Sequence, residues 1–397
     1  MNRSILIGPD RNGRSVALVN GLVAPSPAEN APVHPCEDGE IRPGTVCAHT
    51  HLYSGLGRYG MPAASPPPEN FLQLLERVWW RLDRALDAPT LRAAATDYVA
   101  RALLAGTTAL VDHHESPNLI EGSLAVLAEV CEQLGMRALL CYGATERNAG
   151  RDEASRGLEE CRRVPASPLI RGLVGLHASF TVSDDTVCAA AELTRELGTV
   201  LHVHVAEDGA DVEDAQSRGF AGPLERLSKL GALVPGSILA HGVHLNREQV
   251  EMAGTLSCWL VQNPRSNVAN RVGYADCLQY ASKVALGTDG WNCDMNEEQA
   301  VLLRLAKLHH DRRAEGRLAG GHALIAERFA SKPEPLSPGA LGDVVVWQDG
   351  RVRHSIVGGR VVVKDGQLTG GTIDAISAAA QDSAARLWDR VRMTCSG

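Results

Sequence analysis

The stretch Thr45-Val46-Cys47-Ala48-His49-Thr50-His51 joins an apolar run to a His-x-His pair. The apolar run predicts a buried strand, and two histidines two residues apart point to the same side of a strand. An open, doubly wound sheet would instead want a Gly-rich loop after its first strand. A first strand that ends in His-x-His therefore favours a closed barrel, in which such side chains meet at one end.

Similar apolar runs recur up to residue 290, and longer helical patterns separate them. The predicted strands are 45–49, 107–112, 137–143, 170–177, 199–205, 237–241, 256–262 and 283–288. The helical patterns lie at 71–86, 91–105, 119–134, 153–162, 184–197, 222–231, 246–253 and 275–281. Strands that alternate with helices predict parallel βα units, and eight such units close a barrel. The predicted fold class is α/β, a (β/α)8 TIM-like barrel.

Both ends of the chain lie outside this barrel. Residues 1–43 are rich in Pro, Gly and Asn, and residues 340–368 contain two strand patterns, 343–347 and 359–363. Asp-Gly pairs at 349–350 and 365–366 indicate hairpin-like turns after these patterns. We expect a barrel at 44–335, with further helices at 296–331. Residues 1–43 and 336–397 are expected to form one small β-rich domain with a C-terminal helix at 374–392.

Composition and charge exclude several classes of partner. The net charge of −8, without a dense Lys or Arg run, argues against nucleic acid and suits a small neutral or cationic molecule. No run of about eighteen apolar residues predicts a membrane span. Residues 1–8 lack the apolar core of a signal peptide, and the ten cysteines contain no C-x-x-C pair. These features predict a cytoplasmic protein with reduced thiols.

Residues that bind metals also end three later strands. His204 ends the fifth predicted strand, His241 the sixth and Asp289 the eighth. Any one of the fourteen histidines could be an ordinary buried side chain, but their joint position at strand ends predicts a shared site. Three imidazoles and one carboxylate suit Zn²⁺, and iron(II) would also accept them. We predict that one divalent metal is held by His49, His51, His204 and Asp289.

The fifth strand offers two histidines, because His202 should share the face of His204. We choose His204 because Glu207 follows three residues later, where the strand turns into its loop and a carboxylate can fold back over a metal. His202 would then fill the barrel more deeply. The alternative for Glu207 is a solvated carboxylate that opens a helix together with Asp208.

Several motifs resemble those of the amidohydrolase superfamily. They are V-C-A-H-T-H at 46–51, H-V-A-E at 204–207, A-H-G-V-H at 240–244 and G-T-D-G at 287–290. Within the superfamily the chain resembles the cytosine/guanine deaminase and chlorohydrolase-like group. D-H-H-E-S-P at 112–117 and N-P-R-S-N at 263–267 resemble the SsnA-type aminohydrolases. The resemblance covers nearly the whole chain, including L-S-P-G-A at 336–340.

The resemblance also implies a single metal. Binuclear members of the superfamily bridge two metals with a carboxylated lysine on the fourth strand. Here no lysine lies between His51 and His204, and the first in the chain is Lys229. The fourth strand ends in Gly-Leu-His-Ala at 175–178, and deaminase-like members have a substrate-contacting histidine at the position of His177. An ordinary barrel-end histidine is the alternative for His177.

The predicted reaction is deamination of a small nitrogen heterocycle or amidine-like substrate by a metal-bound hydroxide, with release of ammonia. A zinc ion lowers the pKa of its water to about 7. Asp289 would take the proton of that water, and Glu207 would protonate a ring nitrogen and then the leaving amine. His241 would stabilise the attacking oxygen.

The substrate itself is not predicted by the sequence. Contacts are expected from His177, from His114 of the pair at 113–114, and from Trp291 and Asn292. The same site could expel another leaving group, as a chlorohydrolase, an N-dealkylating enzyme or a cyclic amide hydrolase. A more distant alternative is an inactive barrel that serves as a scaffold. Relatives often form dimers, so a homodimer is a further expectation.

Overall fold

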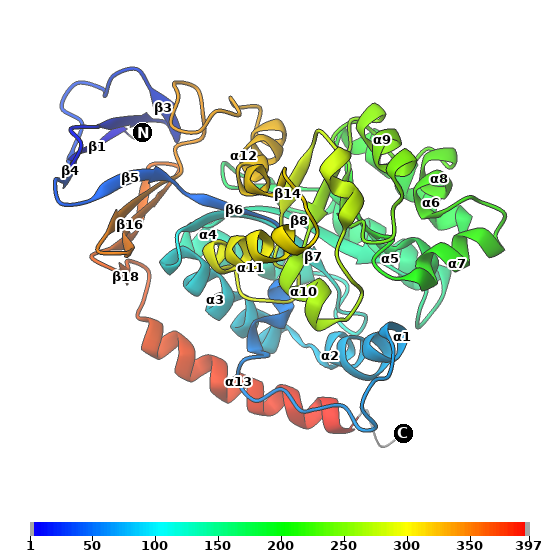
Figure 1. Ribbon diagram of the computed structural model, residues 1–397. Coiled ribbons are helices and arrows are strands. Elements are labelled where there is room, and N and C mark those ends of the chain that lie inside the picture. The colour runs from blue at the N-terminus through cyan, green and yellow to red at the C-terminus, as the bar shows by residue number, and fades with distance from the viewer. Residues whose placement is uncertain (1–3, 394–397) are drawn as a thin grey trace.

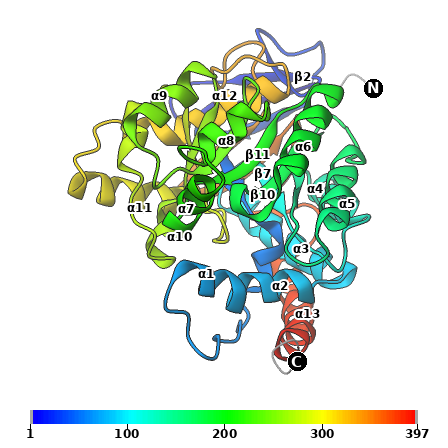
Figure 2. The same ribbon diagram turned by 90° about the vertical axis from the view of Figure 1, so that its right-hand side faces the viewer.

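The computed structural model describes residues 4–393, in which eight parallel strand positions form a barrel surrounded by helices (Figures 1 and 2). The strands are β6 (Thr45–Thr50), β7 (Thr107–His114), β8 (Arg137–Ala144), β9 (Ile170–Gly172), β10 (Val174–Ala178), β11 (Leu201–Val205), β12 (Ile238–His241), β13 (Trp259–Gln262) and β14 (Val284–Leu286). The fourth position is split, since β9 and β10 both pair with β8. The predicted α/β barrel is confirmed.

The ring closes where β14 returns to β6. The amides of Thr288 and Asp289 donate to the carbonyl oxygen of His49 at 2.9 and 3.0 Å. The amide of His51 donates in turn to the carbonyl oxygen of Asp289 at 3.3 Å. The seam of the barrel is therefore the place where the first and last predicted metal ligands meet.

The helices follow most of the predicted ranges. They are α1 (Phe71–Leu74), the π-helical segment η2 (Leu75–Trp79), α2 (Trp80–Ala85), α3 (Ala88–Leu104), α4 (Ser123–Leu134), α5 (Arg151–Arg162), α6 (Asp184–Leu197), α8 (Pro223–Lys229), α9 (Arg247–Thr255), α11 (Met295–Leu308) and α12 (Arg317–Arg328). Two more, α7 (Gly209–Ser217) and α10 (Pro264–Ala269), were not predicted, because they are short and lack a long apolar period. The helix expected at 275–281 is a single 3₁₀ segment, η4 (Asp276–Tyr280).

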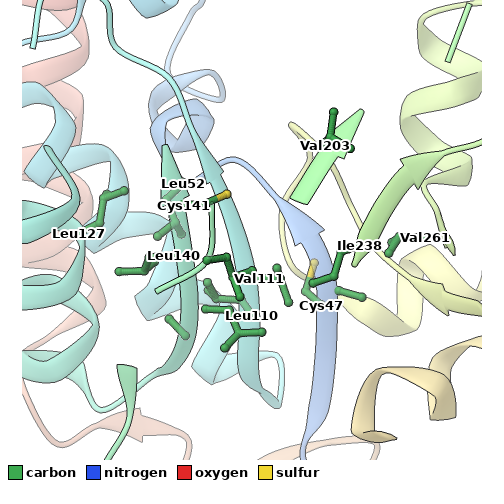
Figure 3. Packing of buried hydrophobic residues seen from close by; sticks show 14 of the residues in the cluster. Cys47, Leu52, Leu110, Val111, Leu127, Leu140, Cys141, Val203, Ile238 and Val261 are labelled. Carbon is green, nitrogen blue, oxygen red and sulfur yellow. The ribbon is translucent and has the colours of Figure 1, made fainter. Parts of the chain in front are cut away.

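The core of the barrel is aliphatic, as its low aromatic content requires. Apolar side chains from neighbouring strands gather there (Figure 3). The exposed fraction is zero for Cys47, Leu110, Val111, Leu140, Val203, Ile238 and Val261. Fully burying such a side chain contributes about 1.5–3 kcal/mol. This packing fixes the strands whose ends carry the site.

Two small sheets lie beside the barrel (Figure 1). One contains β1 (Ser4–Asp10), β2 (Val16–Val19), β3 (Leu22–Ala24) and β4 (Val33–Cys36). The other contains β5 (Glu40–Pro43), β15 (Val344–Gln348), β16 (Arg351–Val357), β17 (Arg360–Lys364) and β18 (Gln367–Leu368). The sequence predicted only β15 and β17 near the C-terminus. It missed β16 because polar Arg351, His354 and Ser355 interrupt its apolar pattern. The prediction that residues 1–8 are not a signal peptide concerns a segment of which residues 1–3 lie outside the described residues.

The C-terminal helix α13 (Ile373–Met393) packs along α3 and reaches α2 and η1 (Leu52–Leu56) (Figure 1). Near its end, Trp388 Nε1 donates to the carbonyl oxygen of Tyr59 at 2.8 Å, and Arg390 Nε donates to that of Ala85 at 2.7 Å. No helix within residues 4–393 has the length and apolar character needed to cross a lipid bilayer.

Candidate metal centre and substrate cavity

The carboxyl ends of the strands bring the four predicted ligands together. His49 and His51 lie at the end of β6, His204 on β11, and Asp289 just after β14. One donor atom from each lies within 4.8 Å of the others. Asp289 Oδ1 is 2.8 Å from His51 Nε2 and 3.4 Å from His49 Nε2. This convergence is the arrangement that the strand-end motifs predicted.

The donor set fits a divalent metal. His49 Nε2 is buried and has no hydrogen-bond partner, a state that costs free energy unless another group satisfies it. His51 Nδ1 lies 2.5 Å from the carbonyl oxygen of His113, and His204 Nδ1 lies 2.6 Å from that of His177. Because a carbonyl only accepts, both Nδ1 atoms carry the proton. The Nε2 lone pairs are thereby left for a cation.

His202 has a different place from His204. Its Nε2 lies 2.9 Å from His49 Nδ1, and its Nδ1 lies 3.6 Å from Cys141 Sγ. If His49 Nε2 carries its lone pair toward the cluster, His49 Nδ1 donates its proton to His202. His202 therefore supports the ring of His49 from behind, whereas His204 belongs to the cluster itself.

The charges of the cluster are strongly coupled. Burial lowers the pKa of His49 to about 3, so this ring is neutral at pH 7. Burial also disfavours the charged form of His51, but the hydrogen bond to Asp289 and the charge of Asp289 outweigh burial. Together they raise the pKa of His51 to about 9. Burial would raise the pKa of Asp289, yet the neighbouring rings of His49 and His51 lower it. A metal that binds here must therefore displace the proton shared by His51 and Asp289.

Glu207 and His241 lie beside the cluster. His241 Nε2 is 3.5 Å from Glu207 Oε2, and donor atoms of these two residues and of Asp289 lie within 4.8 Å of one another. His241 Nδ1 donates to Asn267 Oδ1 at 2.9 Å, and Asn270 Nδ2 donates to Glu207 Oε1 at 3.2 Å. Burial, with a contribution from the charge of Asp289, raises the pKa of Glu207 to about 7.

Three residues at these positions have a strained backbone. Ala206, His241 and Asp289 have φ values of +50°, +74° and +53°, a region that residues other than glycine adopt rarely. Such conformations cost about 1–3 kcal/mol each and persist only where the surroundings impose them. The amide of Ala206, for example, donates to Asp211 Oδ2 at 2.7 Å. This bond holds the turn that places Glu207.

A cavity opens over the cluster. Its lining includes His51, His204, Glu207 and Asp289 together with Glu115, His177 and five aromatic residues, Tyr53, Phe71, Trp79, Trp80 and Phe180. Aromatic residues make up only 4% of the chain, yet five of them line this cavity. Trp79 belongs to the π-helical turn η2, and such turns are frequent at functional sites. Sequence reasoning missed the aromatic wall and Glu115, since no spacing rule links them.

The four predicted substrate contacts are placed differently from one another. His177 lines the cavity. His114 is buried, and its Nε2 lies 2.7 Å from Ser116 Oγ. Trp291 is 46 % exposed, and Asn292 Oδ1 accepts from Arg265 at 3.0 Å. His114, Trp291 and Asn292 are not among the described residues that line the cavity. Their contact with a substrate stays a prediction.

A sequence model of the Amidohydrolase family matches residues 41–362. An 8-oxoguanine deaminase of Pseudomonas aeruginosa is 26% identical, over 88% of this chain and 84% of the relative. A 5′-deoxyadenosine deaminase of Methanopyrus kandleri is 27% identical, over 84% of this chain and 85% of the relative. The crystal structure of an adenosine deaminase from Xanthomonas campestris with bound zinc has a TM-score of 0.80 at 22% identity, covers 97% of each chain and supports the fold.

Proposed function

The chain belongs to the amidohydrolase family, and we propose that it is a mononuclear metal-dependent aminohydrolase. Its reaction would be the hydrolytic removal of an amino group, as ammonia, from a small nitrogen heterocycle. The observation that carries this proposal is the convergence of four metal-binding side chains and Glu207 at strand ends beneath one cavity. The deaminases among its relatives support the same chemistry.

The metal would be held by His49, His51, His204 and Asp289. We propose zinc, since three imidazoles and one carboxylate are ligands that it prefers, with iron(II) as the alternative. When bound, such an ion lowers the pKa of a coordinated water molecule to about 7 and so supplies a nucleophile at neutral pH.

The protein's own groups would then move the protons. Asp289 Oδ1 faces the histidine cluster while Ser266 Oγ donates to Oδ2, so the carboxylate is oriented to accept a proton from the attacking water. Asn270 holds Oε1 of Glu207. A pKa of about 7 lets Glu207 give a proton to a ring nitrogen and take one back at neutral pH.

His241 would act on the oxygen that adds to the ring. Asn267 holds Nδ1, and the buried Nε2 has no hydrogen-bond partner. This nitrogen is therefore free to interact with the attacking oxygen as charge develops there. The aromatic wall would meanwhile hold a flat ring between apolar faces, as such pockets commonly do.

An ammonia-release screen with purines, pyrimidines, pterins and triazines tests the proposal, together with metal analysis of protein purified without added zinc. We expect one equivalent of metal and ammonia from at least one compound. Release of chloride or of an alkylamine without ammonia would replace deamination by another hydrolysis. A substoichiometric metal content without any turnover would instead favour the scaffold alternative.

Three further predictions accompany this function. The division into a barrel at 44–335 and a domain from 1–43 and 336–397 is proposed from the two sheets outside the ring. We also propose a cytoplasmic location, which the nine described cysteines, all free, support. A homodimer is proposed as well, and sedimentation analysis would test it.

A further inference from the structure

Glu115 is a buried carboxylate that the proposed reaction does not use. It directly follows β7, only 3% of its surface is exposed, and it lines the substrate cavity. Its Oε2 accepts from Arg147 Nη2 at 3.0 Å and lies 3.5 Å from His177 Nε2. Its Oε1 lies 3.4 Å from His113 Nδ1. Glu115 follows the second strand position of the ring and Glu207 follows the fifth, so two carboxylates face the cavity from separate strands.

The guanidinium of Arg147 donates hydrogen bonds to two carboxylates on this side of the cavity, Glu115 and Asp83. Arg147 Nη2 also donates to Asp83 Oδ2 at 2.9 Å, and the guanidinium lies 4.6 Å from the centroid of the Trp80 ring. Burial would raise the pKa of Glu115, but His177, His113 and Arg147 outweigh it and lower the pKa. Glu115 is therefore ionised and accepts from Arg147.

A second metal does not explain this carboxylate. Donor atoms of His113, Glu115 and His204 lie within 4.8 Å of one another. However, His204 is already needed for the first cluster, and Arg147 already places a positive charge against Glu115. A further cation would be repelled by that guanidinium at short range.

The lining of the cavity is acidic as a whole. It includes Glu115, Glu207, Asp208, Asp211 and Asp289. No Lys or Arg occurs among the described residues of the lining. A phosphate or carboxylate group on a substrate would be repelled by this surface, whereas N–H groups would be attracted.

We propose that Glu115 is a specificity-determining residue, whose carboxylate accepts a hydrogen bond from an N–H group of the substrate. This inference rests on the proposed deaminase function. Glu207 would protonate one edge of the ring, and Glu115 would accept a hydrogen bond from an N–H group on a second edge. The preferred substrate is then a flat, uncharged or cationic heterocycle with N–H donors on two edges, such as an amino- and oxo-substituted purine. A ring with only hydrogen-bond acceptors at the edge that faces Glu115 would leave the buried carboxylate without a donor. Such a ring should therefore bind much more weakly.

Steady-state ammonia release from 8-oxoguanine, guanine and 5′-deoxyadenosine tests the inference, with the wild type, Glu115→Gln and Glu115→Asp. The first two compounds carry ring N–H donors, and the adenine ring of the third carries none. We expect the wild type to prefer the first two. A hydrogen bond to a charged group contributes about 1.5–3 kcal/mol, so Glu115→Gln should raise their KM by about 10- to 100-fold with a smaller change in kcat. Glu115→Asp, which keeps the charge, should fall between the two.

Glu121→Gln is the matched control, because Glu121 lies in the same loop but is exposed and paired with Arg156. It should leave all kinetic constants unchanged. Metal content and thermal unfolding of Glu115→Gln should match the wild type, because Arg147 keeps Asp83 as a partner. Preference for 5′-deoxyadenosine, or an unchanged KM in Glu115→Gln, would overturn the inference and leave the deaminase function standing. No ammonia from any compound of the wider screen would overturn both.

Discussion

The two sides of the cavity are built in different ways. The side that carries the proposed metal ligands comes from the ends of three separate strands, and backbone carbonyls hold the rings of His51 and His204. The aromatic side includes Phe71, Trp79 and Trp80 from one helical segment with a π-helical turn. Hydrogen bonds of the barrel therefore hold the proposed ligands, and we expect that the aromatic side can change without moving the cluster.

This difference suggests that reaction chemistry and substrate choice are separable here. A substitution on the metal-binding side should remove turnover for every substrate. One on the aromatic side should change which substrate binds and leave the metal in place. The following experiments would break or sharpen this contrast.

Asp289→Ala should have the largest effect. It removes a ligand and breaks the contacts with His49 and His51. Since a bound metal supplies several kcal/mol of transition-state stabilisation, we expect a drop of ~10³-fold or more in kcat/KM and loss of the metal. Elemental analysis and ammonia release measure both. Asp276→Ala, an exposed substitution beside His309, is the control. An active variant with a full metal content would remove Asp289 from the ligand set.

Glu207→Gln should come next. The amide keeps the shape of the side chain but cannot transfer a proton, so kcat should fall by ~10²-fold or more while the metal stays bound. Single-turnover kinetics with metal analysis distinguish this result from loss of the metal. Wild-type turnover in this variant would contradict the proton-transfer role.

Trp80→Ala tests the other side of the cavity. Loss of an aromatic face should raise KM by about 10-fold, with the metal content unchanged and kcat affected less. Trp80→Phe keeps a ring and should recover most of the affinity. A loss of metal in Trp80→Ala would show that the two sides are not independent.

The last prediction concerns stability rather than turnover, at Asp211, which holds the turn before Glu207. Burial raises its pKa to about 7, while an unfolded aspartate titrates near 3.9. Its contribution to stability is therefore fully present below about pH 4 and is lost as the pH rises to about 7, by ~1.4 kcal/mol for each pKa unit. In Asp211→Asn this part of the pH dependence should vanish. Urea unfolding at pH 5 and pH 8 measures it, and an unchanged difference between the two pH values would contradict the raised pKa.

Much of the barrel could be predicted because its signals are local. Buried parallel strands are continuous apolar runs, and Gly135 and Gly198 end helices in the left-handed conformation that glycine favours, with φ of +84° and +60°. The convergence of the four proposed ligands was predictable for the same reason, since each lies at or just after a strand end. Only the choice between His202 and His204 needed Glu207 as a guide.

The substrate side could not be predicted in this way. Glu115, Arg147 and Asp83 come from three different loops and segments, and their ion pairs exist only after the barrel closes. Local pattern also failed for α7, whose sequence is polar, and for β16, whose apolar positions are interrupted. In each case contacts between distant residues determine the structure, and such contacts leave no periodic pattern in the sequence.

Helix α13 makes its contacts with Tyr59 and with Ala85 of α2 depend on the order of synthesis. Tyr59 and Ala85 leave the ribosome long before Trp388 and Arg390, whose side chains donate to their carbonyl oxygens. The last strand of the ring, β14, is also made before α13. A nascent chain can therefore complete the strands of its ring while α2 and the segment at Tyr59 still lack their contacts with α13.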